Sequence, residues 1–361
     1  MRRTLVVLSW TLAGLVACER ALSLQERSAR RASSRLRRLV PPALLEGKAV
    51  AALRVEDTAR REVLLYARTS GGWRCLSRFG VPAAEARLGS YVGRILEAEG
   101  ILQKQDAGSA DRFGLAPPRL LRVSLHGPRA LQDRGHDLIA LAEIGATLPG
   151  GRGTYARSGV SHEVIAVDGD LRGDLAWPAA TGLAPLVDPG IVPAAWSMSA
   201  SVERIEVHPQ GAAPFELRKR ARPMREEILA GALPWEWVLV TGGRQETPSP
   251  GPPSAYARFL QSAKYELALD PRLAPGLGLD RPRARVVLYP AEGQALEIQI
   301  GGPAPAGGVT VRNALTQSVF AVDSEVAALL VPGAEALRRS AKVTPWDARL
   351  PRPSSGPEAG P

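Results

Sequence analysis

The sequence predicts an α+β protein of two tandem, duplicated lobes, each a mainly antiparallel sheet with one or two packed helices. Three observations predict this class: an internal repeat, strands of period two, and a helix that begins near a proline in each half. Residues 112–118 (RFGLAPP) recur as residues 275–282 (PGLGLDRP), and landmarks on both sides recur in the same order. Two halves rich in Val, Leu and Gly could resemble each other by chance, but the shared order argues against that alternative.

Three strand patterns open each half. The first strand is predicted at 50–55 and 202–207, and a second, shorter one at 63–66 and 215–217. A tryptophan then begins a third strand, Trp73 in one half and Trp237 in the other, with Trp235 as an alternative start. Gly114 follows Trp73 by 41 residues, and Gly278 follows Trp237 by 41. The equal spacing indicates that the same elements lie between these landmarks.

Each half then contains one predicted helix, because proline is favoured in a first helical turn, where its missing N–H is not needed. Pro82 precedes the first helix and Pro253 the second, and Gly100 is expected to end the first. Apolar residues at helical spacing form one face of each helix: Ala84, Leu88, Val92 and Ile95, then Tyr256, Phe259, Leu260 and Ala263.

Four further strands are predicted in each half after the Gly-Leu motif. Apolar residues alternate at 121–125 and 284–288, and strands follow at 141–145, 154–157 and 164–168, matched by 298–301, 309–312 and 319–323. We interpret the repeated landmarks as residues that define the fold, where Gly supplies backbone freedom and Pro begins the next strand. They are Trp73, Gly114, Leu115, Gly145, Trp237, Gly278, Leu279 and Gly301.

The N-terminus has the pattern of a bacterial export signal. Arg2 and Arg3 precede an apolar run of 13 residues, which is shorter than the roughly 20 residues that a membrane-spanning helix needs. Residues 15–18 (LVAC) resemble a lipobox, which predicts a signal peptide at 1–17 and lipidation of Cys18. An uncleaved N-terminal anchor and the absence of any targeting role are the alternatives.

A basic tether is predicted at 18–45. Its arginines could contact the membrane surface as the second signal that a single lipid chain needs, or could simply keep the tether solvated. Positive charge after an exported segment is unusual, so either the lipid fixes the chain or the Arg2-Arg3 pair directs a twin-arginine route. The candidate membrane-contact residues are Arg20, Arg27, Arg30, Arg31, Arg35, Arg37 and Arg38.

The remaining boundaries follow from composition. The first lobe is placed at 46–178, a Pro-containing linker at 179–200, the second lobe at 201–341, and a disordered Pro-rich tail at 342–361. The net charge is +10, but 41 of the 46 basic residues are Arg, so the coding bias of a GC-rich genome is a sufficient explanation. With Cys18 lipidated, Cys75 has no partner for a disulfide and is expected in the core.

The sequence predicts no catalytic residue, no metal and no cofactor. Its four His residues are scattered. Asp168, Asp170 and Asp174 could form a calcium loop, but a turn and helix cap suits them better, since Asp323 occupies the place of Asp168 in the second half. Residues 150–153 are expected to form a hairpin turn, and the basic run 218–222 a solvated loop. No nucleic-acid partner is expected for an exported chain.

Several short motifs, in this order, resemble an uncharacterised bacterial family, the domain of unknown function 4340 family. The matching segments are 72–73 (GW), 113–115 (FGL), 144–145 (IG), 155–157 (YAR), 278–280 (GLD) and 298–301 (IQIG). The resemblance spans roughly residues 46 to 341, although residues 309–312 (VTVR) lack the Tyr-Ala of the family pattern. It implies a membrane-tethered, extracytoplasmic protein, often encoded beside ABC-type export or gliding-motility components. No catalytic residues are established for that family, so none is carried over.

The resulting expectation is a non-catalytic, lipid-anchored accessory or scaffold protein on the periplasmic side of the bacterial envelope, associated with an ABC-type transport or gliding-motility complex. A ligand-binding module that holds glycan, lipid or peptide in a cleft between the lobes is the alternative. A hydrolase that uses His162 or His136 with nearby Asp residues is a third.

Overall fold

The α+β class is confirmed by a computed structural model, in which antiparallel strands predominate and helices are few. It describes residues 36–104, 110–128, 137–159, 161, 163–175, 183, 185–199, 201–222, 234–339 and 344–350. Contacts divide the chain into two compact units. Unit 1 comprises residues 1–68 and 86–186, and unit 2 comprises residues 69–85 and 187–361.

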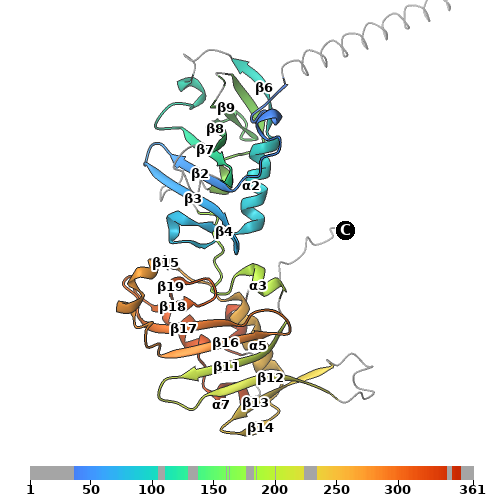
Figure 1. The fold of residues 1–361 in the computed structure, drawn as a ribbon, viewed down its shortest axis with the longest axis vertical. Helices are drawn as coiled ribbons and strands as arrows, with labels where there is room; N and C mark the ends of the chain where they lie inside the picture. Colours follow the sequence, from blue (N-terminus) through green and yellow to red (C-terminus); the bar gives the residue numbers. More distant parts are fainter. Residues whose placement is uncertain are drawn as a thin grey trace, which may run out of the picture. The chain divides into compact units, whose positions relative to one another are not determined.

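The first sheet has the strand order β1-β6-β10-β9-β8-β7-β2-β3-β4-β5 among the described residues (Figure 1). Its elements are β1 (Leu36–Arg38), β2 (Ala52–Asp57), β3 (Glu62–Thr69), β4 (Gly72–Cys75), β5 (Val81–Pro82), α2 (Glu85–Glu97), β6 (Glu99–Lys104), β7 (Leu121–His126), β8 (Leu138–Thr147), β9 (Gly153–Ser158) and β10 (Val164–Asp168).

The second sheet has the order β14-β13-β12-β11-β16-β17-β18-β19-β15. Its elements are α3 (Ala194–Ser199), β11 (Val202–Pro209), β12 (Phe215–Ala221), β13 (Trp235–Thr241), β14 (Arg244–Glu246), α5 (Gly251–Ser262), β15 (Leu267–Leu269), β16 (Ala284–Pro290), β17 (Leu296–Pro303), β18 (Val309–Asn313), β19 (Ser318–Val322), α6 (Ser324–Leu330) and α7 (Ala334–Arg338).

The two sheets have the same topology. Apart from β1, each strand of the first sheet has a counterpart of the same rank in the second, from β6 and β15 at one edge to β5 and β14 at the other. The strand registers agree as well, because Val55 pairs with Val123 just as Val207 pairs with Val286. The duplication read from the sequence is therefore a duplication of the fold.

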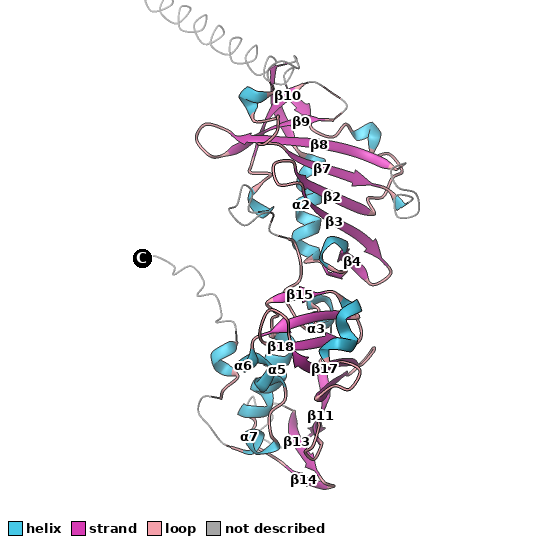
Figure 2. Ribbon diagram, turned by 90° about the vertical axis from the view of Figure 1, so that its left-hand side faces the viewer, coloured by secondary structure: helices cyan, strands magenta, loops and turns pink. Residues whose placement is uncertain are grey.

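Each sheet buries one face against a helix that follows its first hairpin strands. Leu88, Tyr91 and Ile95 form the buried stripe of α2, and Figures 1 and 2 show this helix lying against the first sheet. Tyr256, Phe259 and Leu260 do the same for α5. The predicted alternation holds in β7 and β16, where every second side chain enters the core.

Gly100 does not end the first helix, contrary to the prediction. The helix α2 ends at Glu97, and Gly100 lies in β6, paired with Arg37 and Val167. A Cβ atom at this glycine would lie 2.5 Å from the carbonyl oxygen of Ala166. Glycine is needed here because the backbone of β10 approaches closely, which is a tertiary cause that the local sequence does not reveal.

Two predicted boundary segments contain elements of the fold. Residues 36–38 of the predicted tether form β1, and Leu39 and Val40 are buried. Within the predicted linker, Gly190 makes a β-bridge with Lys264, and α3 follows at Ala194–Ser199. These segments are too short to show periodicity, so their partners decide their structure.

The basic run 218–222 and the start of the tail were also predicted incorrectly. Residues 218–221 belong to β12, where the guanidinium of Arg220 donates to Glu236 (3.1 Å). Trp346 lies beyond the predicted end of the second lobe but is 1 % exposed; its indole N–H donates to the carbonyl of Leu329 (3.2 Å). Because the residues around this tryptophan are Pro-rich, the sequence did not indicate that it belongs to the core.

Candidate functional site

The structure describes two of the candidate membrane-contact arginines, and both form ion pairs. Arg38 lies 2.6 Å from Glu99 on the neighbouring strand, and Arg37 lies 3.5 Å from Glu163. Because acidic partners neutralise them, their pull on anionic lipid is reduced. Cys18, Arg20, Arg27, Arg30, Arg31 and Arg35 lie outside the described residues. No helix in the described ranges is long and apolar enough to cross a bilayer.

A cavity of about 300 Å³ lies beside β1. Its lining is Arg37, Arg38, Leu39, Pro41, Pro42, Ser158, Ser161, Glu163 and Ile165. Glu163 places a carboxylate against Arg37 in this lining, and Arg38 pairs with Glu99 outside it, so both arginines of the cavity have acidic partners. It lies where the chain that follows the predicted anchor joins the first sheet.

The repeated glycines occupy equivalent places in the two copies. Gly114 follows the 3-10 helix Asp111–Phe113 with φ +68°, and Gly278 follows the 3-10 helix Pro271–Leu277 with φ +73°. In both, this left-handed conformation favours glycine over residues with a side chain. The structure therefore gives these two positions the same role in chain reversal.

Gly145 and Gly301 explain why the Gly-Leu motif needs a second glycine on a distant strand. A Cβ atom at Gly145 would lie 2.3 Å from the carbonyl oxygen of Phe113, and one at Gly301 would lie 2.5 Å from that of Leu277. The next residue of each turn, Leu115 or Leu279, packs over the same glycine. Turn and strand thus interlock identically in both sheets.

The two landmark tryptophans lie on corresponding strands. Trp237 is buried in β13, and its ring meets that of Trp235 edge to face at 5.8 Å. Trp73 lies half-buried in β4, where its backbone N–H donates to the Glu85 carboxylate at the start of α2 (3.0 Å). Lys219 lies against the Trp235 ring at 4.6 Å and is held by Glu203 (3.0 Å). These contacts join neighbouring strands and are structural.

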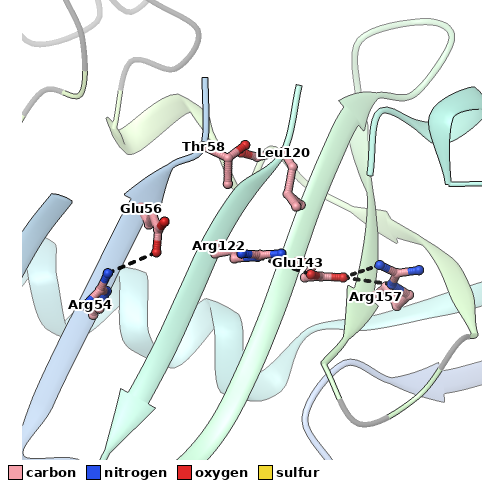
Figure 3. Close-up of polar contacts among 7 residues, drawn as sticks. All are labelled: Arg54, Glu56, Thr58, Leu120, Arg122, Glu143 and Arg157. Atoms are coloured by element: carbon pink, nitrogen blue, oxygen red, sulfur yellow. Dashed lines mark hydrogen bonds and ion pairs between the residues drawn. The ribbon is translucent and has the colours of Figure 1, made fainter. Parts of the chain in front are cut away.

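A chain of charged side chains crosses the first sheet on the face opposite its core. Glu143 of β8 accepts hydrogen bonds from Arg157 of β9 (Nε, 2.8 Å) and Arg122 of β7 (3.4 Å), as Figure 3 shows. Further along this face, Arg54 pairs with Glu56 at 3.1 Å. The residue Glu143 is only 7 % exposed, so its paired guanidinium groups replace the water that its carboxylate would otherwise require.

The second sheet repeats this arrangement with an amide in place of the carboxylate. Gln299 of β17 takes the place of Glu143, and its side-chain oxygen accepts from Arg312 of β18 (Nε, 2.7 Å). Tyr289 of β16 lies on the same side, where its hydroxyl donates to Glu206 (3.1 Å) and Arg204 stacks on its ring at 3.8 Å. An amide and a carboxylate make the same cross-strand contact at equivalent positions, which supports a role in bracing neighbouring strands.

The histidines that the structure describes form two polar pairs. The Nε2 atom of His126 lies 3.0 Å from the Ser124 hydroxyl, and burial together with the charge of Arg54 lowers the pKa of His126. Its Nδ1 atom is buried and has no hydrogen-bond partner among the described residues. A base–nucleophile pair needs a third group to orient the base, so this pair by itself does not define a catalytic triad. His208 lies 3.3 Å from Glu206.

Neither histidine of the hydrolase hypothesis can be placed, since His136 and His162 lie outside the described residues.

Two carboxylates of the calcium hypothesis have other partners. Asp170 accepts from the backbone N–H of Arg172 (2.9 Å), and Asp174 pairs with Arg94. Asp323 caps α6 through the N–H of Glu325 (2.7 Å). Within the described ranges, no cluster of three His, Cys, Asp or Glu residues is placed to hold a metal.

No family model matches the chain, and no match was found among the curated proteins or the solved structures. The resemblance to the domain of unknown function 4340 family therefore stays a prediction from short motifs.

Proposed function

We propose that this protein is a non-catalytic, lipid-anchored accessory or scaffold protein of the bacterial envelope, on the periplasmic side. The observation that carries the proposal is that the chain just after the predicted anchor is built into the first sheet. β1 pairs with β6 over three residues, and the N–H of Leu39 donates to the carbonyl of Ala98 (2.8 Å). A lipid on Cys18 would thereby be coupled to a folded sheet edge.

The length of the intervening chain supports membrane proximity. Leu36 follows Cys18 by 18 residues, which span at most roughly 60–65 Å when fully extended. The edge of the first sheet therefore stays within that distance of the lipid headgroups in a lipidated protein. This suits a protein whose task is to hold a folded surface near a membrane complex.

The character of the repeated residues supports the non-catalytic part of the proposal. The residues shared by the two copies make turns, close strand contacts and core packing, as Gly145 and Gly301 illustrate. On the sheet face opposite the core, Glu143 is paired with Arg157, and Gln299 with Arg312. Association with an ABC-type transport or motility complex rests on the family resemblance alone, and the ligand-binding alternative stays a prediction.

The anchor is tested by Cys18→Ser in the full chain, with Cys75→Ser as the matched control because Cys75 is buried in the folded unit. We expect Cys18→Ser to abolish incorporation of labelled fatty acid and to release the protein from sedimented membranes. The control should keep both label and membrane. Labelling and retention unchanged in Cys18→Ser would refute lipidation.

The accessory role is tested separately, by crosslinking in intact membranes followed by purification of the tagged protein. We expect envelope or transporter proteins to be recovered with it. Recovery of the protein free of any partner, from membranes in which Cys18 is shown to be lipidated, would contradict the role while leaving the anchor intact.

A further inference from the structure

The duplication extends further toward the N-terminus than the motifs that first revealed it. Residues 39–41 (LVP) correspond to residues 191–193 (IVP); Val40 precedes Val55 by 15 residues, and Val192 precedes Val207 by 15. The backbone contacts agree. The N–H of Leu39 donates to the carbonyl directly after α2 (Ala98, 2.8 Å), and that of Ile191 donates to the carbonyl directly after α5 (Ala263, 2.9 Å). The segments 36–39 and 188–191 are therefore counterparts.

In unit 2 this segment is paired on both sides. On its inner side, Gly190 forms a β-bridge with Lys264. On its outer side, Val187 forms a β-bridge with Ala83, and the N–H of Asp188 donates to the carbonyl of Pro82 (3.0 Å). Pro82 ends β5 of the hairpin β4–β5 and Ala83 follows it, and the contacts assign both residues to the same unit. The end of a hairpin thus covers the outer edge of the segment.

In unit 1 the corresponding edge has a different environment. β1 pairs with β6 on its inner side and is the last strand of its sheet among the described residues. Leu36, the counterpart of Asp188, is 45 % exposed, and Ile101, which pairs with it, is 49 % exposed, whereas Asp188 is 8 % exposed. Two large apolar side chains therefore lie at a strand edge that pairs with no other described strand, an arrangement that favours the addition of another strand.

We propose that the β1 edge binds the hairpin β13–β14 of a second copy of this chain. This hairpin is the counterpart of β4–β5, since it has the same rank at the opposite edge of its sheet and likewise precedes the packed helix. β14 is also the terminal strand of its sheet among the described residues. Arg38 of β1 and Glu246 of β14 already have partners in their own units, Glu99 and Arg338, so the duplicated backbone contacts, and not charge, carry the choice of partner.

The proposed contact is heterologous, because it joins two different surfaces. Each complex keeps a free β1 edge at one end and a free β14 edge at the other, so association continues head to tail until a ring closes or a filament forms. The inference rests on the duplicated backbone contacts and is independent of lipidation at Cys18.

A crosslinking experiment tests the geometry directly. One tagged copy of the full chain carries Leu36→Cys, a second copy with a different tag carries Thr247→Cys at the counterpart of Pro82, and both are co-expressed and oxidised in membranes. We expect a disulfide-linked species that contains both tags. The matched control replaces Leu36→Cys with Leu138→Cys, a residue 49 % exposed on β8, and should give no such species.

A second measurement keeps the proposal falsifiable if the cysteine variants fold poorly. The detergent-solubilised full chain should increase in mass with concentration, as measured by light scattering after size exclusion. The double variant Leu36→Lys/Ile101→Lys should raise the protein concentration at which the mass increase is half complete by at least tenfold. Its melting temperature should stay within a few degrees of that of the unchanged chain. A monomer at all concentrations, association that the variant leaves unchanged, or crosslinking of Leu36→Cys only to a different protein would each overturn the proposal.

Discussion

At the residue scale, two equivalent glycines show that the same close backbone contact occurs in both sheets. Gly145 and Gly301 each lie under a backbone carbonyl of the Gly-Leu turn, at distances that no Cβ atom tolerates. The sequence alone suggested that these glycines were structural, but it could not say what approached them. The approaching carbonyls, from Phe113 and Leu277, lie on segments more than twenty residues away. Only the folded backbone supplies that contact.

We therefore predict that Gly145→Ala and Gly301→Ala each destabilise the unit that contains them by about 1–3 kcal/mol, the usual effect of overpacking. Gly93→Ala is the matched control, because nothing lies within 4 Å of its added Cβ and it lies inside α2. The control should be neutral or stabilising by up to about 1 kcal/mol, since alanine favours helix more than glycine does. Urea unfolding of the three variants measures the difference, and equal stability of all three would contradict the steric argument.

A second residue-scale prediction concerns pH. The hydroxyl and backbone N–H of Thr344 donate to the Asp347 carboxylate at 2.7 and 2.8 Å, and these hydrogen bonds lower the pKa of Asp347 below its usual value. A lowered pKa in the folded state means that the stabilisation is present above the unfolded pKa, and is lost as the pH falls through the folded pKa.

Asp347→Asn should therefore cost on the order of 1 kcal/mol at neutral pH, the size of a typical hydrogen bond. The gap between wild type and variant should narrow below about pH 4, the ordinary range for an aspartate. Thermal melts at a series of pH values measure it. A gap that is constant down to pH 2.5 would mean that the ionised carboxylate is not the stabilising form.

At the element scale, the strands and helices that carry periodic apolar residues were predictable. β7 and β16 show the expected alternation, and α2 and α5 bury the predicted faces. The elements that escaped prediction are short and lack an apolar period, such as β1 and the segment around Gly190. The similarity of residues 39–41 to residues 191–193 can nevertheless be seen in the sequence, and it would have assigned both segments to the lobes.

The face opposite each core was only partly predictable at this scale. Alternation alone implies that Arg122, Glu143 and Arg157 point away from the core. It does not imply that they meet, because they come from three strands whose register is set by the fold. That register is needed to compare Glu143 with Gln299. The comparison indicates that both residues belong to a structural network that is repeated in the two sheets.

At the scale of the whole molecule, each compact unit has its own buried core, so we predict two separable unfolding transitions in the full chain. Gly145 lies in unit 1 and Gly301 in unit 2. Gly145→Ala should lower the melting temperature of one transition by several degrees and Gly301→Ala that of the other. Scanning calorimetry separates the two; a single transition shifted equally by both variants would show that the units unfold together.

The sequence by itself determined the fold class, the duplication and most of the strands, because apolar periodicity and turn residues can be read from neighbouring positions along the chain. It also supplied the predictions of lipidation at Cys18 and of a family resemblance. Only the tertiary structure decided that residues 36–38 are part of a sheet, that Gly100 belongs to β6, and that Trp346 belongs to the core. Each of these depends on a contact with a residue far away in the chain. Such contacts exist only in the folded protein, where distant strands pack together.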